Sequence, residues 1–137
     1  MRPLAIPTGT RTVLRMGGKR LTIVYADDDE LMRVTLTDAL VEAGVEVHSC
    51  DDGAGVADLC AEVRPDAVLL DINMPLVGGL EAARVLRSDI RNALLRLVAI
   101  TGQGTWDLRR EAMAAGFDEF LIKPAGVAAL VKALRPV

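Results

Sequence analysis

The sequence lacks long runs of apolar residues. Its longest apolar stretches, such as 67–70 and 97–100, fall well short of the ~20 residues that a membrane-spanning helix needs. The first twenty residues carry five basic and no acidic residues, but they contain neither a continuous apolar segment nor a small-residue cleavage site. We therefore expect a cytoplasmic chain without a membrane segment or a secretory signal.

Cysteine is scarce, and a strong charge of one sign is absent. Cys50 and Cys60 do not have Cys-x-x-Cys spacing, so we expect reduced thiols that help to pack the core, and no disulfide. The formal net charge of −3 gives no basis for direct nucleic-acid binding. This profile is typical of an ordinary globular domain.

The chain of 137 residues has the usual length of one domain. It shows no internal repeat, low-complexity tract or interdomain linker. We expect residues 1–20 to form a poorly ordered extension and residues 21–137 to form the domain.

Short apolar runs alternate with longer segments of helical periodicity from residue 21 onward. The apolar runs predict five strands, at 21–26, 45–50, 67–70, 97–100 and 120–122. Five helices are predicted between 29 and 44 and at 54–63, 78–87, 106–115 and 127–134. This alternation is typical of β-α units on one parallel sheet with helices on both faces. The strand at 45–50 has one polar face, which favours an edge position.

The first predicted helix has clear start and stop signals. Asp29 is a good N-cap, and Gly44 can end the helix with a positive φ. The predicted apolar stripe of this helix consists of Leu31, Val34 or Thr35, Ala39 and Leu40.

Four loops at the predicted carboxyl edge of the sheet carry chemically distinct side chains. They hold Asp27, Asp28 and Asp29 after the first strand, Asp71 after the third, Thr101 after the fourth and Lys123 with Pro124 after the fifth. Ligands of open parallel sheets lie at this edge, so we expect these side chains to meet there. Crowded carboxylates repel one another, and oxygen ligands suit Mg²⁺, so a magnesium site is our hypothesis. Taken alone, the acidic triplet is equally typical of a solvated helix N-terminus.

The combination of side chains indicates phosphoryl transfer. Asp71 supplies a carboxylate nucleophile, Lys123 and a metal neutralise charge, and Thr101 orients a phosphoryl oxygen. Taken singly, Lys123 is typical of a surface charge and Thr101 of a strand-end cap. The combination is therefore far more specific than its members.

Four blocks of the sequence resemble a known family. They are IVYADDD at 23–29, LLDINMP at 69–75 followed by the pair at 78–79, AITG at 99–102, and AGF with FLIKP at 115–117 and 120–124. Their order and spacing resemble the receiver domain of bacterial two-component response regulators, either as a separate protein or within a hybrid histidine kinase. The resemblance implies a flavodoxin-like, doubly wound sheet of five parallel strands in the order 2-1-3-4-5, with five helices.

The resemblance also implies a metal-binding phosphoacceptor site. Asp71 would accept the phosphoryl group. Asp27 and Asp28 would be the acidic pair that holds Mg²⁺, with Asp71 and the backbone carbonyl of Asn73 as further ligands. We interpret Asp29 as a helix cap and not as a ligand.

The same resemblance implies a conformational switch. Thr101 would be the switch hydroxyl, and Lys123 would bind the phosphoryl group and precede a cis bond to Pro124. Phe120 would be the aromatic ring that turns inward with Thr101, although many family members have tyrosine there. A simple core aromatic is the alternative interpretation of Phe120. Gly102 replaces a common alanine and could loosen the loop, which would favour faster hydrolysis of the phosphorylated form.

Partners follow from the same resemblance. The donor would be a histidine kinase or histidine phosphotransfer protein, because the only histidine, His48, lies in a predicted edge strand. Phosphorylation would shift a pre-existing equilibrium, chiefly at the face of the fourth helix, fifth strand and fifth helix, where a downstream protein would dock. We expect a signalling phosphoacceptor that catalyses only its own phosphotransfer and autodephosphorylation, without a direct nucleic-acid or membrane partner.

Other functions fit the sequence less well. A haloacid dehalogenase-type phosphatase would need a second aspartate where Asn73 stands, and a flavodoxin would need a phosphate loop without three carboxylates. A receiver-like interaction module that acts without phosphorylation is the main alternative. Retention of the acceptor, acidic pair, hydroxyl and lysine argues against that alternative.

Overall fold

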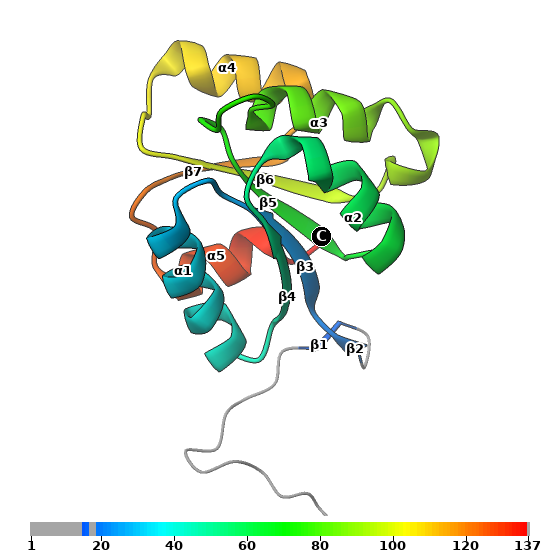
Figure 1. The fold of residues 1–137 in the computed structure, drawn as a ribbon, viewed down its shortest axis with the longest axis vertical. Helices are drawn as coiled ribbons and strands as arrows, with labels where there is room; N and C mark the ends of the chain where they lie inside the picture. Colours follow the sequence, from blue (N-terminus) through cyan, green and yellow to red (C-terminus); the bar gives the residue numbers. More distant parts are fainter. Residues whose placement is uncertain (1–14, 17–18, 137) are drawn as a thin grey trace, which may run out of the picture.

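A five-stranded parallel sheet forms the centre of the protein (Figure 1). The structure is a computed structural model that describes residues 15–16 and 19–136. The sheet has the order β4-β3-β5-β6-β7, so the predicted 2-1-3-4-5 order and the doubly wound fold are confirmed. The strands are β3 (Thr22–Ala26), β4 (Glu46–Cys50), β5 (Ala67–Asp71), β6 (Arg96–Thr101) and β7 (Glu119–Ile122).

Helices cover both faces of the sheet. Figure 1 shows α1 (Glu30–Glu42) and α5 (Val127–Leu134) on one face, and α2 (Val56–Val63), α3 (Gly79–Arg87) and α4 (Trp106–Ala115) on the other. Side chains alternate along each strand, so the sheet divides the core into two apolar clusters. Val24 packs on the side of α3 and α4, whereas Tyr25 packs on the side of α1 and α5. No described helix is both long enough and apolar enough to cross a membrane.

Local sequence signals set both ends of α1 and the C-terminal end of α4. The side chain of Asp29 accepts a hydrogen bond from the amide of Met32 and caps α1. Gly44 and Gly116 follow α1 and α4 with φ values of 96° and 110°, a conformation that costs glycine little. The predicted ends of these helices are therefore confirmed.

The predicted buried stripe of α1 is wrong in part. Leu36 and Leu40 are the buried residues of this helix, whereas Leu31 is 77% and Val34 50% exposed. Apolar residues occur on several sides of α1, so the sequence pattern does not single out one face.

The structure also contains short elements that the sequence pattern did not reveal. β1 (Arg15–Met16) pairs with β2 (Lys19–Arg20) as an antiparallel two-stranded sheet. The rest of the extension predicted at 1–20, namely 1–14 and 17–18, lies outside the described residues. Two 3₁₀ helices, η1 (Gly53–Gly55) and η2 (Ile90–Asn92), precede α2 and follow α3. The helix predicted from Ala54 therefore begins as a 3₁₀ turn.

Arg87 joins α3 to three neighbouring segments. Its Nε donates to the carbonyl of Gly116 at 2.9 Å, and its Nη1 donates to the carbonyls of Asn92 and Leu95 at 2.8 and 2.7 Å. Its Nη2 pairs with Asp118 at 2.9 Å. One guanidinium thus satisfies carbonyls that no other described side chain reaches, and it fixes the C-terminal end of α4 against α3.

Arg87→Ala should destabilise the fold strongly. The substitution removes a set of charge-assisted hydrogen bonds and should lower the free energy of unfolding by about 2–4 kcal/mol. Urea unfolding followed by circular dichroism measures this change. Arg84→Ala is the matched control, because Arg84 is an exposed residue of the same helix whose one ion pair among the described residues, with Glu81, spans 3.9 Å. Equal effects of the two substitutions would contradict this role of Arg87.

Candidate functional site

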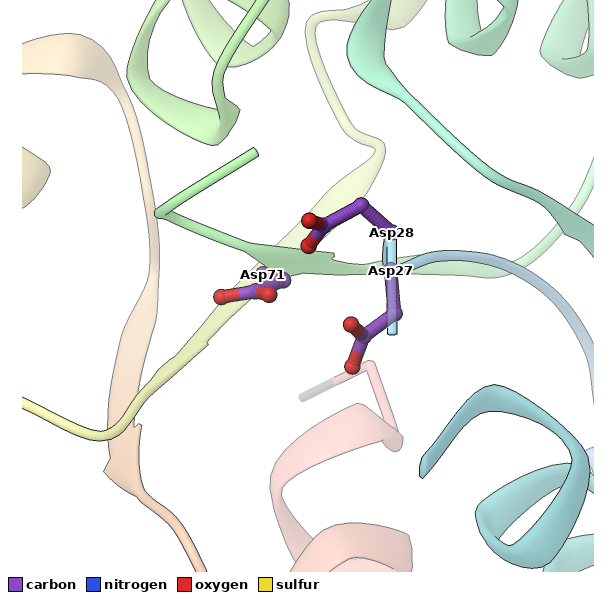
Figure 2. A group of neighbouring side chains, drawn as sticks. All are labelled: Asp27, Asp28 and Asp71. Carbon is purple, nitrogen blue, oxygen red and sulfur yellow. The ribbon is translucent and has the colours of Figure 1, made fainter. Parts of the chain in front are cut away.

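Three carboxylates gather at the carboxyl edge of the sheet (Figure 2). Asp71 is the last residue of β5, and Asp27 and Asp28 follow β3 directly. One oxygen from each of the three residues lies within 4.8 Å of the others. Asp27 and Asp71 are buried and Asp28 is exposed, so the cluster is open to solvent on one side. An all-oxygen group of this size fits one hard cation such as Mg²⁺.

Asp27 is held on both sides of its carboxylate. It is 0% exposed, its Oδ1 accepts from the amide of Asp29 at 3.0 Å, and its Oδ2 accepts from the Tyr25 hydroxyl at 2.8 Å. Its backbone carbonyl accepts from Nη1 of Arg33 at 2.7 Å. These bonds come from β3, the following loop and α1, so the position of Asp27 is set by three segments.

Lys123 links Asp27 to Asp71. Its Nζ lies 3.2 Å from Oδ2 of each aspartate. The amide of Lys123 donates to the carbonyl of Thr101 at 2.8 Å, which ties the loop after β7 to the end of β6. The peptide bond from Lys123 to Pro124 is cis. A single ammonium group therefore serves two buried carboxylates, and negative charge remains in excess.

The excess charge changes the acidity of the site. Burial, and then the charge of Asp27, raise the pKa of Asp71 to about 6, although Lys123 opposes this shift. Burial alone would lower the pKa of Lys123, but the two carboxylates outweigh burial and the net shift is upward. At neutral pH the site thus combines one ammonium with an ionised Asp71.

Thr101 and Asn73 lie next to Asp71. Thr101 is fully buried, and its Oγ1 accepts from Nδ2 of Asn73 at 3.3 Å and from the amide of Gln103 at 3.2 Å. The amide of Asn73 donates to Oδ1 of Asp71 at 3.2 Å. The structure therefore brings the residues predicted at the loops after β3, β5, β6 and β7 into one site.

Phe120 lies in the core between β7 and α4. It is 6% exposed, and the guanidinium of Arg109 lies 5.8 Å from the centre of its ring. Sequence reasoning singled out Phe120 but missed Arg109 and Tyr25. Tyr25 had one detectable signal, since it is a tyrosine two residues before Asp27 and thus close to the end of the same strand.

Comparison with known proteins places this arrangement in a family. The sequence-family model of the response regulator receiver domain matches residues 23–135. The chain belongs to the response regulator receiver family. It is 36% identical over 113 residues to response regulator MprA of a Mycobacterium species (strain KMS), which covers 82% of this chain and 48% of that protein. The receiver thus spans about half the length of the curated relatives it matches.

Solved receiver structures have the same fold. Chemotaxis protein CheY4 of Vibrio cholerae is 25% identical, with a TM-score of 0.78 over 83% of this chain and 95% of that chain. The receiver domain of NarL from Mycobacterium tuberculosis is 30% identical, with a TM-score of 0.74 over 83% and 92% of the two chains. The receiver domain of sensor kinase PA1611 from Pseudomonas aeruginosa, 24% identical with a TM-score of 0.77 over 83% and 93%, was crystallised with magnesium in its active-site cleft.

Asp71→Asn should stabilise the metal-free receiver at neutral pH. The pKa of Asp71 is about 6 in the fold against a usual 3.8, so the folded state holds this proton more tightly than the unfolded state. This contribution is fully favourable at low pH and is lost as pH rises through the folded pKa. Removal of the charge should therefore raise the free energy of unfolding on the order of 1–3 kcal/mol near pH 7.

Urea unfolding in metal-free buffer at several pH values measures this gain. The gain should shrink as pH falls from about 6 to about 4, because wild-type Asp71 then becomes neutral itself. Asp38→Asn, at an exposed position of α1, controls for the loss of one surface charge. A gain that does not vary with pH would contradict the charge explanation.

Proposed function

We propose that this receiver is a phosphorylation-activated signalling switch that accepts a phosphoryl group on Asp71 from a histidine kinase or a histidine phosphotransfer protein. The observation that carries the proposal is the position of Asp71, buried at the sheet edge beside the acidic pair and in contact with Lys123. With a pKa of about 6, its carboxylate is ionised at neutral pH and can act as a nucleophile.

In the transfer step, an oxygen of Asp71 forms a bond to phosphorus as the phosphorus–nitrogen bond of the donor phosphohistidine breaks, and the imidazole leaves with that electron pair. Lys123 contacts Asp71 already and compensates the incoming negative charge. The hydroxyl of Thr101 donates to a phosphoryl oxygen. Mg²⁺ would be held by the side chains of Asp27, Asp28 and Asp71 and the backbone carbonyl of Asn73, and would neutralise developing charge.

The output surface in this proposal is the face of α4, β7 and α5. Thr101 and Phe120 would couple the site to this face, because Thr101 ends β6 and Phe120 packs beneath α4. Three large apolar side chains are exposed on α4 and β7, namely Trp106, Met113 and Ile122. A downstream protein is the proposed occupant, and direct nucleic-acid binding is not part of the proposal.

The proposed unit of function is residues 21–137, in the cytoplasm, and the match of the family model to residues 23–135 supports this boundary. The chain acts as a signalling protein that also removes its own phosphoryl group. A Cβ at Gly102 would meet no atom within 4 Å, so Gly102→Ala is sterically permitted and tests whether this glycine shortens the phosphorylated lifetime.

Incubation with acetyl phosphate and Mg²⁺ should add one phosphoryl group to the receiver. Intact-protein mass spectrometry measures the gain, which should depend on Mg²⁺, vanish in Asp71→Asn and be lost after treatment with hydroxylamine, because an acyl phosphate reacts with that nucleophile. No gain in a folded wild-type sample would remove the proposal and favour the interaction module that acts without phosphorylation.

Lys123→Ala should separate phosphorylation from switching. Trp106 is the only tryptophan of the chain, is 76% exposed and begins α4, so its fluorescence reports on the proposed output face. Phosphorylation should change this fluorescence in the wild type. Lys123→Ala should still gain a phosphoryl group by mass but should show little fluorescence change, because the ammonium that would draw the phosphoryl group inward is missing. A wild-type fluorescence change in this variant would refute the role of Lys123.

A further inference from the structure

Tyr25 places a hydroxyl group beneath the acidic site. It is the only tyrosine of the chain, it is 0% exposed, and it lies on β3 in the apolar cluster formed with α1 and α5. Its hydroxyl donates to Oδ2 of Asp27 at 2.8 Å. Both residues are buried, so this hydrogen bond gives a partner to two polar groups that are shielded from water.

Oδ2 of Asp27 has two donors of different character. The Tyr25 hydroxyl comes from a central strand and is fixed by close packing, whereas the Lys123 ammonium comes from a loop and is shared with Asp71. The other oxygen, Oδ1, is occupied by the amide of Asp29. Among the described residues, Tyr25 is thus the one side-chain donor to the carboxylate of Asp27 that does not also contact Asp71.

Phosphorylation of Asp71 would compete for Lys123. The phosphoryl group adds negative oxygens next to Asp71, and the ammonium of Lys123 is 3.2 Å from that carboxylate. Movement of Lys123 toward the new group takes a donor away from Oδ2 of Asp27. A buried carboxylate oxygen without a donor is costly, so this movement is easy only if another donor stays in place.

We propose that Tyr25 is a positioning residue for phosphotransfer: its hydroxyl keeps Oδ2 of Asp27 paired while Lys123 turns from Asp27 toward the phosphoryl group on Asp71. The inference rests on the proposed function. Tyr25 gains and loses no proton in this role. Burial and the hydrogen bond to Asp27 raise the pKa of Tyr25, which agrees with a neutral hydroxyl that only donates.

Tyr25→Phe tests the proposal because it removes the hydroxyl and retains the ring. At saturating Mg²⁺ the rate of phosphorylation by acetyl phosphate should fall at least about fivefold, the size expected for one buried oxygen that loses its donor. In a Lys123→Ala background the same substitution should cause no further fall, since there is no lysine to move. An unchanged rate in Tyr25→Phe alone, or equal falls in both backgrounds, would overturn the proposal.

Unfolding in metal-free buffer gives a second measurement that does not involve activity. Tyr25→Phe should lower the urea midpoint slightly in the wild type, where Lys123 still serves Oδ2 of Asp27. In Lys123→Ala it should lower the midpoint much more, because Oδ2 of Asp27 would then have no side-chain donor among the described residues. Equal falls would indicate packing alone and overturn the proposal. A wild type that takes up no phosphoryl group would instead refute the proposed function, so the two failures are distinguishable.

Discussion

The position of one ammonium group between two buried carboxylates is the constraint on which the rest of the site depends. Lys123 lies 3.2 Å from both Asp27 and Asp71 and cannot neutralise both. Burial, together with the uncompensated negative charge of Asp27, raises the pKa of Asp71, and the excess negative charge favours a hard cation at the site. In the proposed function, the charge of an added phosphoryl group is compensated only if Lys123 moves toward it. Metal preference and switching in that function therefore depend on the same excess of negative charge that contributes to the raised pKa of Asp71.

The fold tolerates this charged arrangement because the three side chains come from separate segments that hold them in place. Asp71 ends a strand that is buried along its whole length, Asp27 follows the neighbouring strand, and Lys123 follows β7, an edge strand of the sheet. The parallel topology alone brings these three chain segments to one edge. Tight packing of β3 and β5 then keeps the two carboxylates close despite their repulsion, and burial strengthens each hydrogen bond that they accept.

The sequence predicted the features that depend on which residue types stand in the loops and on the order of the strands and loops along the chain. Parallel-sheet periodicity and the order of the loops were enough to predict a parallel sheet covered by helices and the meeting of Asp27, Asp71 and Lys123. The strand order came from the resemblance to the receiver family. Contacts that depend on side-chain direction were not predictable in this way. In the sequence Tyr25 is an ordinary strand residue, and only the structure shows that its hydroxyl donates to Asp27. Arg109 is likewise an ordinary charged residue in the sequence, and only the structure places its guanidinium over the ring of Phe120. The exposed Leu31 shows the same limit, because α1 has apolar residues on several sides.

The central claim is that Asp71, and no other carboxylate of the cluster, carries the phosphoryl group. Borohydride reduces an aspartyl phosphate to homoserine, so reduction of the phosphorylated receiver followed by peptide mass spectrometry locates the modified residue. The account predicts homoserine at position 71 alone. Homoserine at position 27 or 28 would contradict it, because the buried carboxylate of Asp71 would then not be the nucleophile.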